Sequence, residues 1–239
     1  MNLVIDVGNS RIKYAFFEGK NLSLKDSIVP DDFQKLLNHC EDRIIDTIFI
    51  MASGDLKSEW IELLRHKGNV VLWSDETKLP ISILYESPQT LGKDRIAGAV
   101  AAWTLFPNQT SLIIDMGTCI TSNIINKEGQ YLGGTISPGL SMRAKSMHQF
   151  TDKLPLVELT LPKQFIGRNT LESMQNGVLR GTYYEIQSLI DNISPIFGVN
   201  NVILTGGDAK TFENLLNFEI FALPNLVLLG IHEILQYNE

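Results

Sequence analysis

Two runs of apolar, β-forming residues are each interrupted by the same polar turn and then resume. The runs occupy residues 3–5 and 12–17 around Asp6-Val-Gly8, and residues 112–114 and 120–125 around Asp115-Met-Gly117. Apolar runs that are broken by turn residues predict β-hairpins, and a third strand is expected at 131–136. The same pattern therefore occurs twice, with its aspartates 109 residues apart, and this indicates an internal repeat.

The rest of the chain alternates between helical and strand patterns. Helices are expected at 31–40, 56–67, 140–150, 171–193 and 226–235, and further buried strands at 44–52, 70–73 and 202–205. Trp60, Leu63 and Leu64 are predicted to form the apolar face of the second helix. Such β–α alternation predicts an α/β fold in which helices cover the sheets.

The Asp-x-Gly turns have two interpretations. Glycine two residues after an aspartate permits a close backbone approach, so that exposed amides can meet phosphate oxygens while the carboxylate faces a metal ion. Two such turns, opposed across a cleft, would hold one polyphosphate. A single Asp-x-Gly is more often an ordinary hairpin turn without chemistry. Two copies behind matching buried strands favour the phosphate site.

Composition narrows the class of partner. The 239 residues suit one compact unit or two small lobes, and 44% hydrophobic residues are ample for a core. The net charge of −7 argues against nucleic-acid binding, which usually needs a clustered basic face, and favours a small-molecule partner. Cys40 and Cys119 lack CxxC or histidine spacing, so neither a disulfide framework nor a zinc site is predicted.

No stretch predicts insertion into a membrane. The longest apolar stretch, 96–106, is too short to span a bilayer, and the first residues enter a strand without a basic segment or an apolar signal core. We therefore expect a soluble cytoplasmic protein. The four histidines, His148 among them, lack the spacing of metal ligands and are expected to be structural or exposed.

The first turn carries a cluster of charge in the segment Asp6 to Lys13. Asp6 would face magnesium, directly or through water, and Gly8 would bring the backbone near phosphate. Lys13 would neutralise phosphate charge, although it could equally be an outward strand residue that alternates with Arg11. The segment is not a P-loop, because GxxxxGK[ST] is absent.

A second cluster of charge, Gly92-Lys93-Asp94-Arg95, opens an alanine-rich helix whose next residues are apolar. Asp94 could be an ordinary cap or first-turn acid that stabilises the helix dipole, and Arg95 could merely pair with it. As a functional pair, Asp94 would receive or orient a substrate hydroxyl, and Arg95 would bind a carboxylate through two parallel hydrogen bonds.

Six motifs along almost the whole chain resemble the type III pantothenate kinase family. They are DVGNSRIK, LGKDR, IIDMGTCIT, LGGTISPGL, GRNTLESMQNG and TGGDA, in this order. The resemblance implies the actin-like ATPase and sugar-kinase superfold, with two ribonuclease-H-like lobes of mixed β-sheets flanked by helices. We place the lobes at 1–107 and 108–239, with the boundary at Pro107-Asn108.

The resemblance also implies roles for particular residues. The first phosphate loop would consist of Asp6, Val7, Gly8, Asn9, Ser10, Arg11, Ile12 and Lys13, with Ser10 where the family often has threonine. Pantothenate would be contacted by Tyr85, Gly92, Lys93, Asp94 and Arg95, with Asp94 as the proton acceptor. Asp115 would bind a monovalent cation, K⁺ or NH₄⁺, and Thr118 would contact ATP.

Thr170 lies at the start of the helix expected at 171–193. In the family the matching threonine reaches pantothenate across a dimer interface, whereas the residues alone make Thr170 a candidate helix cap. The apolar stripe of this helix fits an ordinary core helix as well as an interface. The paired glycines that end the strand at 202–205 would let adenine or ribose lie close, or would simply form a turn capped by Asp208.

The expected function is Mg-dependent transfer of phosphate from ATP to the primary hydroxyl of pantothenate, the first step towards coenzyme A, by a homodimer. Another small-molecule phosphotransferase or a phosphatase remains open. So does a nucleotide-binding regulator without turnover. The presence of Asp94 beside Asp6 and Asp115 favours the enzyme, since a regulator could have lost any of the three.

Overall fold

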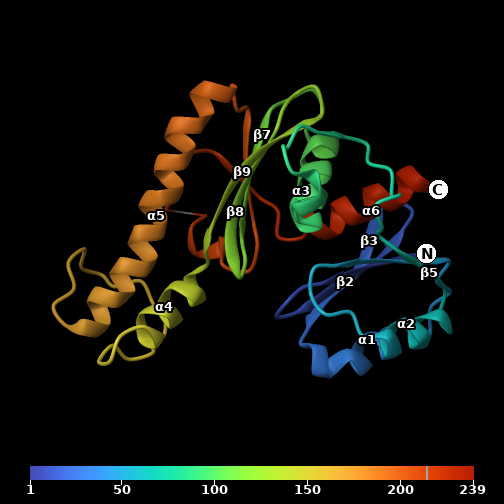
Figure 1. Cartoon of the computed structure of the whole chain (residues 1–239), viewed down its shortest axis with the longest axis horizontal. Helices are drawn as coiled ribbons and strands as arrows, with labels where there is room; N and C mark the ends of the chain where they lie inside the picture. The colour runs from blue at the N-terminus through green and yellow to red at the C-terminus, as the bar shows by residue number, and fades with distance from the viewer. Residues whose placement is uncertain (214) are drawn as a thin grey trace. The chain divides into compact units, whose positions relative to one another are not determined.

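The computed structural model describes residues 1–213 and 215–239, and these form two compact units (Figure 1). The first unit comprises Met1–Leu105, Gly129–Tyr131 and Asn225–Glu239, and the second comprises Phe106–Glu128 and Leu132–Pro224. The division of the chain into lobes at Pro107-Asn108 stays a prediction. None of the described helices is long and apolar enough to cross a membrane.

The first unit is built on a five-stranded mixed sheet in the order β3-β2-β1-β4-β5. The strands are β1 (Asn2–Val7), β2 (Ile12–Glu18), β3 (Asn21–Ile28), β4 (Thr47–Ala52) and β5 (Asn69–Leu72). β1, β2 and β3 pair antiparallel as a meander, whereas β4 and β5 continue the sheet in parallel with β1. The predicted N-terminal hairpin is confirmed.

Each face of this sheet is covered by helices. The short 3₁₀ helix η1 (Pro30–Asp32) leads into α1 (Phe33–Cys40), which packs with α2 (Ser58–Arg65) over one face, where the rings of Phe33 and Trp60 stack with centroids 4.7 Å apart. The prediction for Leu63 is wrong, because its side chain is 44% exposed and only Trp60 and Leu64 of that set are buried.

Helices α3 (Lys93–Leu105) and α6 (Leu226–Asn238) pack against each other, and α6 lies on β1, β2 and β4. Gly230 makes their close approach possible, since a Cβ there would lie 1.8 Å from the carbonyl oxygen of Ala97. His232 of α6 stacks on Phe17 of β2 with ring centroids 4.0 Å apart. Burial lowers the pKa of His232 to about 4, with a smaller effect from Lys20, so this imidazole is a neutral core side chain at pH 7.

The second sheet has β6 (Ser82–Ile83) at one edge, next to β9, and its other five strands repeat this topology in the order β9-β8-β7-β10-β11. They are β7 (Ser111–Met116), β8 (Cys119–Ile125), β9 (Gln130–Pro138), β10 (Asn201–Thr205) and β11 (Ile220–Ala222). β7 and β8 form an antiparallel hairpin, and β10 and β11 continue in parallel with β7, as β4 and β5 do with β1. The internal repeat predicted from the two hairpins is confirmed at the level of strand order.

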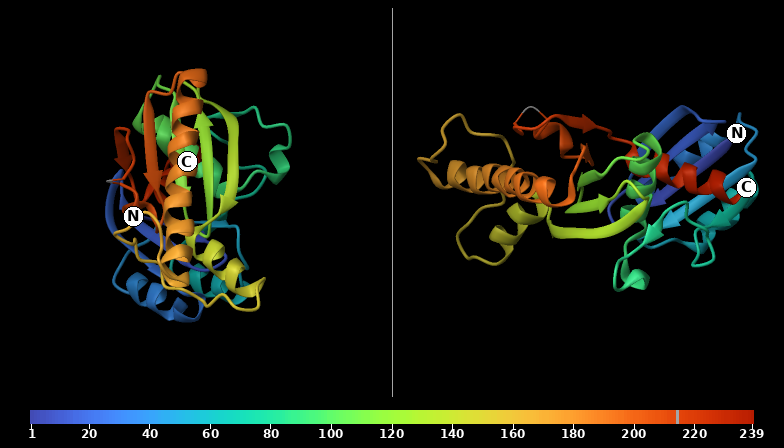
Figure 2. Two further views of the ribbon diagram at one scale, coloured as in Figure 1. Left: turned by 90° about the vertical axis from the view of Figure 1, so that its left-hand side faces the viewer. Right: turned by 90° about the horizontal axis from the view of Figure 1, so that it is seen from above.

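One long helix, α5 (Thr170–Phe197), runs across this second sheet (Figure 2). Its buried apolar residues pack with those of β7 and β10 in a single core, to which α4 (Leu140–Gln149) adds Leu140 and Ala144. α5 extends beyond the predicted end at residue 193, because Pro195 is accommodated in its last turn. The helix then ends at Gly198, which adopts the left-handed conformation with φ of 61°.

Candidate active site

The first candidate element is the turn between β1 and β2. Asp6 is the penultimate residue of β1, is only 7% exposed, and pairs across the hairpin with Lys13. Directly opposed residues of an antiparallel pair project from the same face of a sheet, so the Asp6 carboxylate and the Lys13 ammonium share one face. The Gly8 amide closes the turn by donating to the Arg11 carbonyl oxygen at 3.0 Å. Asn9 and Ser10 at its tip are exposed.

The side chains of the other residues predicted for this loop do not all face a ligand. Val7 and Ile12 are buried in the core, so only their backbone can face a ligand. The Arg11 guanidinium donates to Ser27 of β3, at 2.7 Å to the hydroxyl and 2.6 Å to the carbonyl oxygen. Asp6 and Lys13 are therefore the charged groups of the loop best placed to act together.

The turn rests on the residues that follow β4. The amides of Ser53 and Gly54 both donate to the Val7 carbonyl oxygen at 2.9 Å. A Cβ on Gly54 would lie 2.5 Å from the carbonyl oxygen of Gly8, well inside contact distance. Gly54 is thus required for the position of the turn, a role that the sequence analysis did not assign.

Replacing Gly54 with alanine is expected to displace the turn and to lower kcat/KM for ATP by at least about tenfold, because misplacement by about 1 Å can cost on the order of a hundredfold. Steady-state kinetics at varied ATP measure this. Gly177→Ala is the matched control, since nothing lies within 4 Å of a Cβ there. An unchanged kcat/KM in a folded Gly54→Ala protein would show that the turn does not position nucleotide.

The second candidate element is the corresponding turn between β7 and β8. Asp115 is the penultimate residue of β7, as Asp6 is of β1, and it pairs with Thr121 of β8 and Thr205 of β10. The Gly117 amide donates to the Cys119 carbonyl oxygen at 3.1 Å. Thr118 is exposed at the tip, where a ligand can reach it.

Two glycines bring other backbone segments against the Asp115 turn. Gly206, with φ of 95°, lies so close that a Cβ would be 2.5 Å from both Asp115 Oδ1 and the Met116 carbonyl oxygen. A Cβ on Gly139 would similarly lie 2.4 Å from the carbonyl oxygen of Gly117. Carboxylate and carbonyl oxygens therefore gather at this turn, which is the donor set that hard cations prefer.

Asp208 follows these glycines and does not cap the short helix η3 (Ala209–Thr211) with its side chain. Its amide donates to the Met116 carbonyl oxygen at 3.0 Å, so the residue is fixed beside the same turn. Burial raises the pKa of this carboxyl above its ordinary value. Asp208 is therefore the N-cap residue of η3 by position, as one of the two interpretations has it, but without a capping hydrogen bond from its side chain.

The third candidate element is the start of α3. Asp94 Oδ1 accepts a hydrogen bond from the Arg95 amide at 2.9 Å, and a Cβ on Gly92 would lie 2.4 Å from that same oxygen. Glycine at position 92 thus leaves room for the carboxylate. Arg95 is buried, with its guanidinium carbon 5.9 Å from the centroid of the half-buried Tyr85 ring. The Lys93 ammonium is directed elsewhere and donates to the Trp73 carbonyl oxygen at 2.8 Å.

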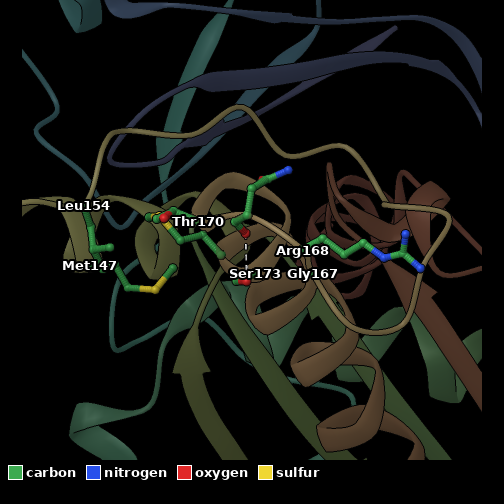
Figure 3. A pocket seen from close by; sticks show the side chains of 8 residues that line it. Met147, Leu154, Gly167, Arg168, Thr170 and Ser173 are labelled. Atoms are coloured by element: carbon green, nitrogen blue, oxygen red, sulfur yellow. Dashed lines mark hydrogen bonds between the residues drawn. The ribbon is translucent and has the colours of Figure 1, made fainter.

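The fourth candidate, Thr170, is the exposed first residue of α5. Asn169 rather than Thr170 caps this helix, because Asn169 Oδ1 accepts from the Glu172 amide at 2.9 Å while Glu172 accepts from the Arg168 amide. The interpretation of Thr170 as the cap is therefore wrong. Thr170 instead lines a cavity of about 500 Å³ together with Met147 and Leu154 (Figure 3).

Comparison with known families identifies the chain. A profile of the type III pantothenate kinase family matches residues 2–192. The chain belongs to the type III pantothenate kinase family. Relatives extend this match to the full length. The type III pantothenate kinase of Cytophaga hutchinsonii is 39% identical over 240 residues, covering 100% of both chains. That of Bacteroides fragilis is 40% identical over 242 residues, covering 100% of this chain and 98% of its own.

Solved structures confirm the predicted fold class. A protein assigned to the Baf family of transcriptional activators, from Campylobacter jejuni, superposes with a TM-score of 0.64 at 23% identity, covering 99% of this chain and 98% of its own. A protein assigned as a 2-dehydro-3-deoxygalactonokinase, from Sinorhizobium meliloti, superposes with a TM-score of 0.61 at 9% identity over 100% and 99% of the two chains. The two mixed sheets flanked by helices are the fold of actin-like ATPases and sugar kinases.

Family membership implies ATP and a divalent metal, so the donors in the chain can be tested for fit. Among residues 1–213 and 215–239 there is no group of three or more His, Cys, Asp or Glu side chains that could hold a metal ion. Mg²⁺ in kinases is usually held by one or two carboxylates together with substrate phosphates and water. The buried Asp6 carboxylate beside Lys13 fits that mode of binding.

Proposed function

We propose that the chain transfers the γ-phosphate of ATP to the primary hydroxyl of pantothenate, the first step of coenzyme A synthesis. Membership of the type III pantothenate kinase family over the full length carries this proposal. The start of α3 supports it, because it places a carboxylate and a buried guanidinium on consecutive residues, Asp94 and Arg95. Pantothenate has a hydroxyl that can donate to the Asp94 carboxylate and a carboxylate that can pair with the Arg95 guanidinium.

In this mechanism Asp94 orients the pantothenate hydroxyl and accepts its proton. The hydrogen bond from the Arg95 amide to Oδ1 fixes the carboxylate, and Oδ2 makes no hydrogen bond within the described part of the chain. Oδ2 is therefore the oxygen that receives the substrate hydroxyl. Arg95 binds the pantothenate carboxylate, since guanidinium and carboxylate match in a bidentate pair. Holding both ends of the substrate positions the hydroxyl for in-line attack.

The Asp6 turn and Thr118 act on the nucleotide in this proposal. Lys13 would neutralise phosphate charge, the tip amides of Asn9 and Ser10 would donate to phosphate oxygens, and Asp6 would help to hold a magnesium ion. Magnesium, when bound there, would neutralise the negative charge that develops on the phosphates. The close packing of Gly54 beneath the turn supports this role, since it fixes the backbone that meets the phosphates.

The leading alternative is a nucleotide-binding regulator without turnover. The likeness to the protein assigned as a transcriptional activator is at 23% identity and shows the fold alone. Asp94, Asp6 and Asp115 are all present, and this favours the enzyme over a regulator. Measurement of ADP formation with and without pantothenate distinguishes the two. ADP formation is expected to depend on pantothenate. If ATP and several other nucleoside triphosphates are hydrolysed at a rate that does not change when pantothenate is added, pantothenate is not the substrate.

We further propose that Asp115 contributes to a monovalent cation site. K⁺ or NH₄⁺ is expected to raise the rate beyond that with Mg²⁺ alone, and Na⁺ to raise it less, because an oxygen-lined site selects by size and ligand number. The gathering of the Asp115 carboxylate and nearby carbonyl oxygens supports this site. The measurement uses enzyme stripped of K⁺ and NH₄⁺, assayed in different chlorides at constant ionic strength. Equal rates in all salts would remove this role.

We also propose a cytoplasmic homodimer in which Thr170 of one subunit completes the pantothenate site of the other. Thr170 is exposed, and its hydroxyl makes no hydrogen bond to any residue that the structure describes. Several large apolar side chains around the start of α5 are exposed as well. They include Phe150, Leu156, Phe165, Ile166 and Leu171. Several large apolar side chains left exposed in one segment, 150–171, favour a surface that is covered by a partner.

A further inference from the structure

Tyr131 lies in β9 but belongs to the first unit. Gly129–Tyr131 belongs to that unit, although the residues on both sides of it belong to the second. The segment pairs in parallel with β6 (Ser82–Ile83), and the Leu84 amide donates to the Tyr131 carbonyl oxygen at 2.9 Å. The strand that fixes Tyr131 therefore leads directly to Tyr85, one of the predicted pantothenate contacts.

The segment is held tightly at its start. Gly129 has φ of 73°, and a Cβ there would lie 3.0 Å from the Trp103 ring of α3. The Ser82 amide donates to the Gly129 carbonyl oxygen at 2.9 Å. Contacts to both β6 and α3 thus fix the position of Tyr131 relative to the helix that carries Asp94 and Arg95.

Tyr131, Tyr85 and Arg95 form a compact triangle. The Arg95 guanidinium carbon lies 5.9 Å from the centroid of each ring, and the two centroids are 6.2 Å apart with an interplanar angle of 71°. The guanidinium therefore occupies the corner between two rings that meet edge to face. Two aromatic faces restrict its rotation and exclude water, which strengthens its interaction with a carboxylate.

We propose that Tyr131 is a positioning residue for pantothenate: its ring, together with that of Tyr85, holds the Arg95 guanidinium in the orientation that binds the substrate carboxylate. This inference rests on the proposed function, in which Arg95 binds that carboxylate. It assigns a role to a residue of β9 that none of the motifs around α3 includes.

The Tyr131 hydroxyl does not act as a base in this role. Tyr131 is fully buried, and burial raises its pKa to about 12, while the nearby Arg95 opposes that rise. The phenol is therefore neutral at any pH at which the enzyme would be assayed. A neutral ring presents its negative π face to a cation, whereas a general base would need to exchange a proton near neutral pH.

The test compares Tyr131→Phe with Tyr131→Leu in steady-state assays at varied pantothenate. Tyr131→Phe keeps the ring, so its KM for pantothenate is expected to stay within about threefold of the wild-type value. Tyr131→Leu removes it and is expected to raise KM for pantothenate about 5- to 30-fold, the range of a desolvated cation–π contact, with kcat and KM for ATP nearly unchanged. Should Tyr131→Leu not fold, Tyr131→Met, whose unbranched side chain adapts to an irregular gap, carries the same comparison.

A double-mutant cycle with Arg95→Met separates positioning from general packing. If Tyr131 acts through Arg95, adding Tyr131→Leu to Arg95→Met raises KM for pantothenate less than about twofold further, because the group being positioned is already absent. Additive effects of the two substitutions would overturn the inference. An equal rise in KM for pantothenate in Tyr131→Phe would also overturn it. A fall in kcat in Tyr131→Leu without a change in KM would do the same. A wild-type protein that never phosphorylates pantothenate would instead refute the proposed function.

Discussion

Replacing Asp94 with asparagine is expected to lower kcat about 10²- to 10⁴-fold, while affinity for nucleotide changes little. Asparagine keeps the shape of the side chain and a carbonyl oxygen that can still accept the Arg95 amide, so the start of α3 should be preserved. What it loses is the charge and basicity of the oxygen that receives the substrate proton. The loss should therefore appear in turnover rather than in binding.

Single-turnover and steady-state assays, together with nucleotide titration of the same preparation, measure this separation. Asp42→Asn is a matched control, because it makes the same chemical change at an exposed carboxylate in the same unit. Its kinetics should match wild type. Undiminished turnover in Asp94→Asn would leave Asp94 with only the role of a first-turn acid that stabilises the helix dipole.

Two inactive variants are expected to restore activity to each other when they share a dimer. Asp94→Asn lacks the base but retains Thr170, whereas Thr170→Trp blocks the neighbouring pocket but retains Asp94. If Thr170 acts across the interface, one pocket of each heterodimer carries both lesions and the other is intact. Each heterodimer should then recover up to about half of the wild-type rate, provided that the pockets act independently.

The experiment co-refolds differently tagged subunits and isolates the heterodimer before assay. Thr170→Ser is the control for the hydroxyl, since it keeps the oxygen and should remain active. Sedimentation should show a dimer at the assay concentration. A fully active monomer, or an isolated heterodimer that recovers no activity, would place Thr170 in the site of its own subunit or outside the site altogether.

The parts of the fold that depend on local pattern were predictable from the sequence. The hairpins at Asp6 and Asp115 were predicted because apolar runs and turn glycines act over a few residues. The same strand order in both units then follows the repeat, as the paired order β3-β2-β1-β4-β5 and β9-β8-β7-β10-β11 shows. The identity of the substrate was predicted from the family motifs, because the repeat by itself indicates only a phosphate site.

The contacts that were missed join residues distant in sequence. Gly54 approaches Gly8 only because β4 lies parallel to β1, and Tyr131 reaches Arg95 only because β9 pairs with β6. No local pattern encodes either approach, although a glycine one or two residues after a buried strand, as at Gly206 and Gly54, is a usable signal.

Errors at the start of α5 have a different origin. Asn169 and Thr170 are both good cap residues, and propensity alone does not choose between them. Glu172 decides, because its carboxylate accepts from the Arg168 amide when Asn169 is the cap. The outcome leaves the Thr170 hydroxyl available for a substrate, whereas a cap would have used it.

The most direct test of the central claim is the identity of the phosphorylated product. Wild-type protein is incubated with pantothenate and Mg-ATP, and the product is examined by mass spectrometry and proton-coupled ³¹P NMR. Transfer to the primary hydroxyl predicts a phosphomonoester whose phosphorus resonance is split into a triplet by the two methylene protons, and about 10²- to 10⁴-fold slower formation of this product by Asp94→Asn at equal enzyme concentration. A doublet, from the secondary hydroxyl, or ADP without any phosphopantothenate would contradict the account.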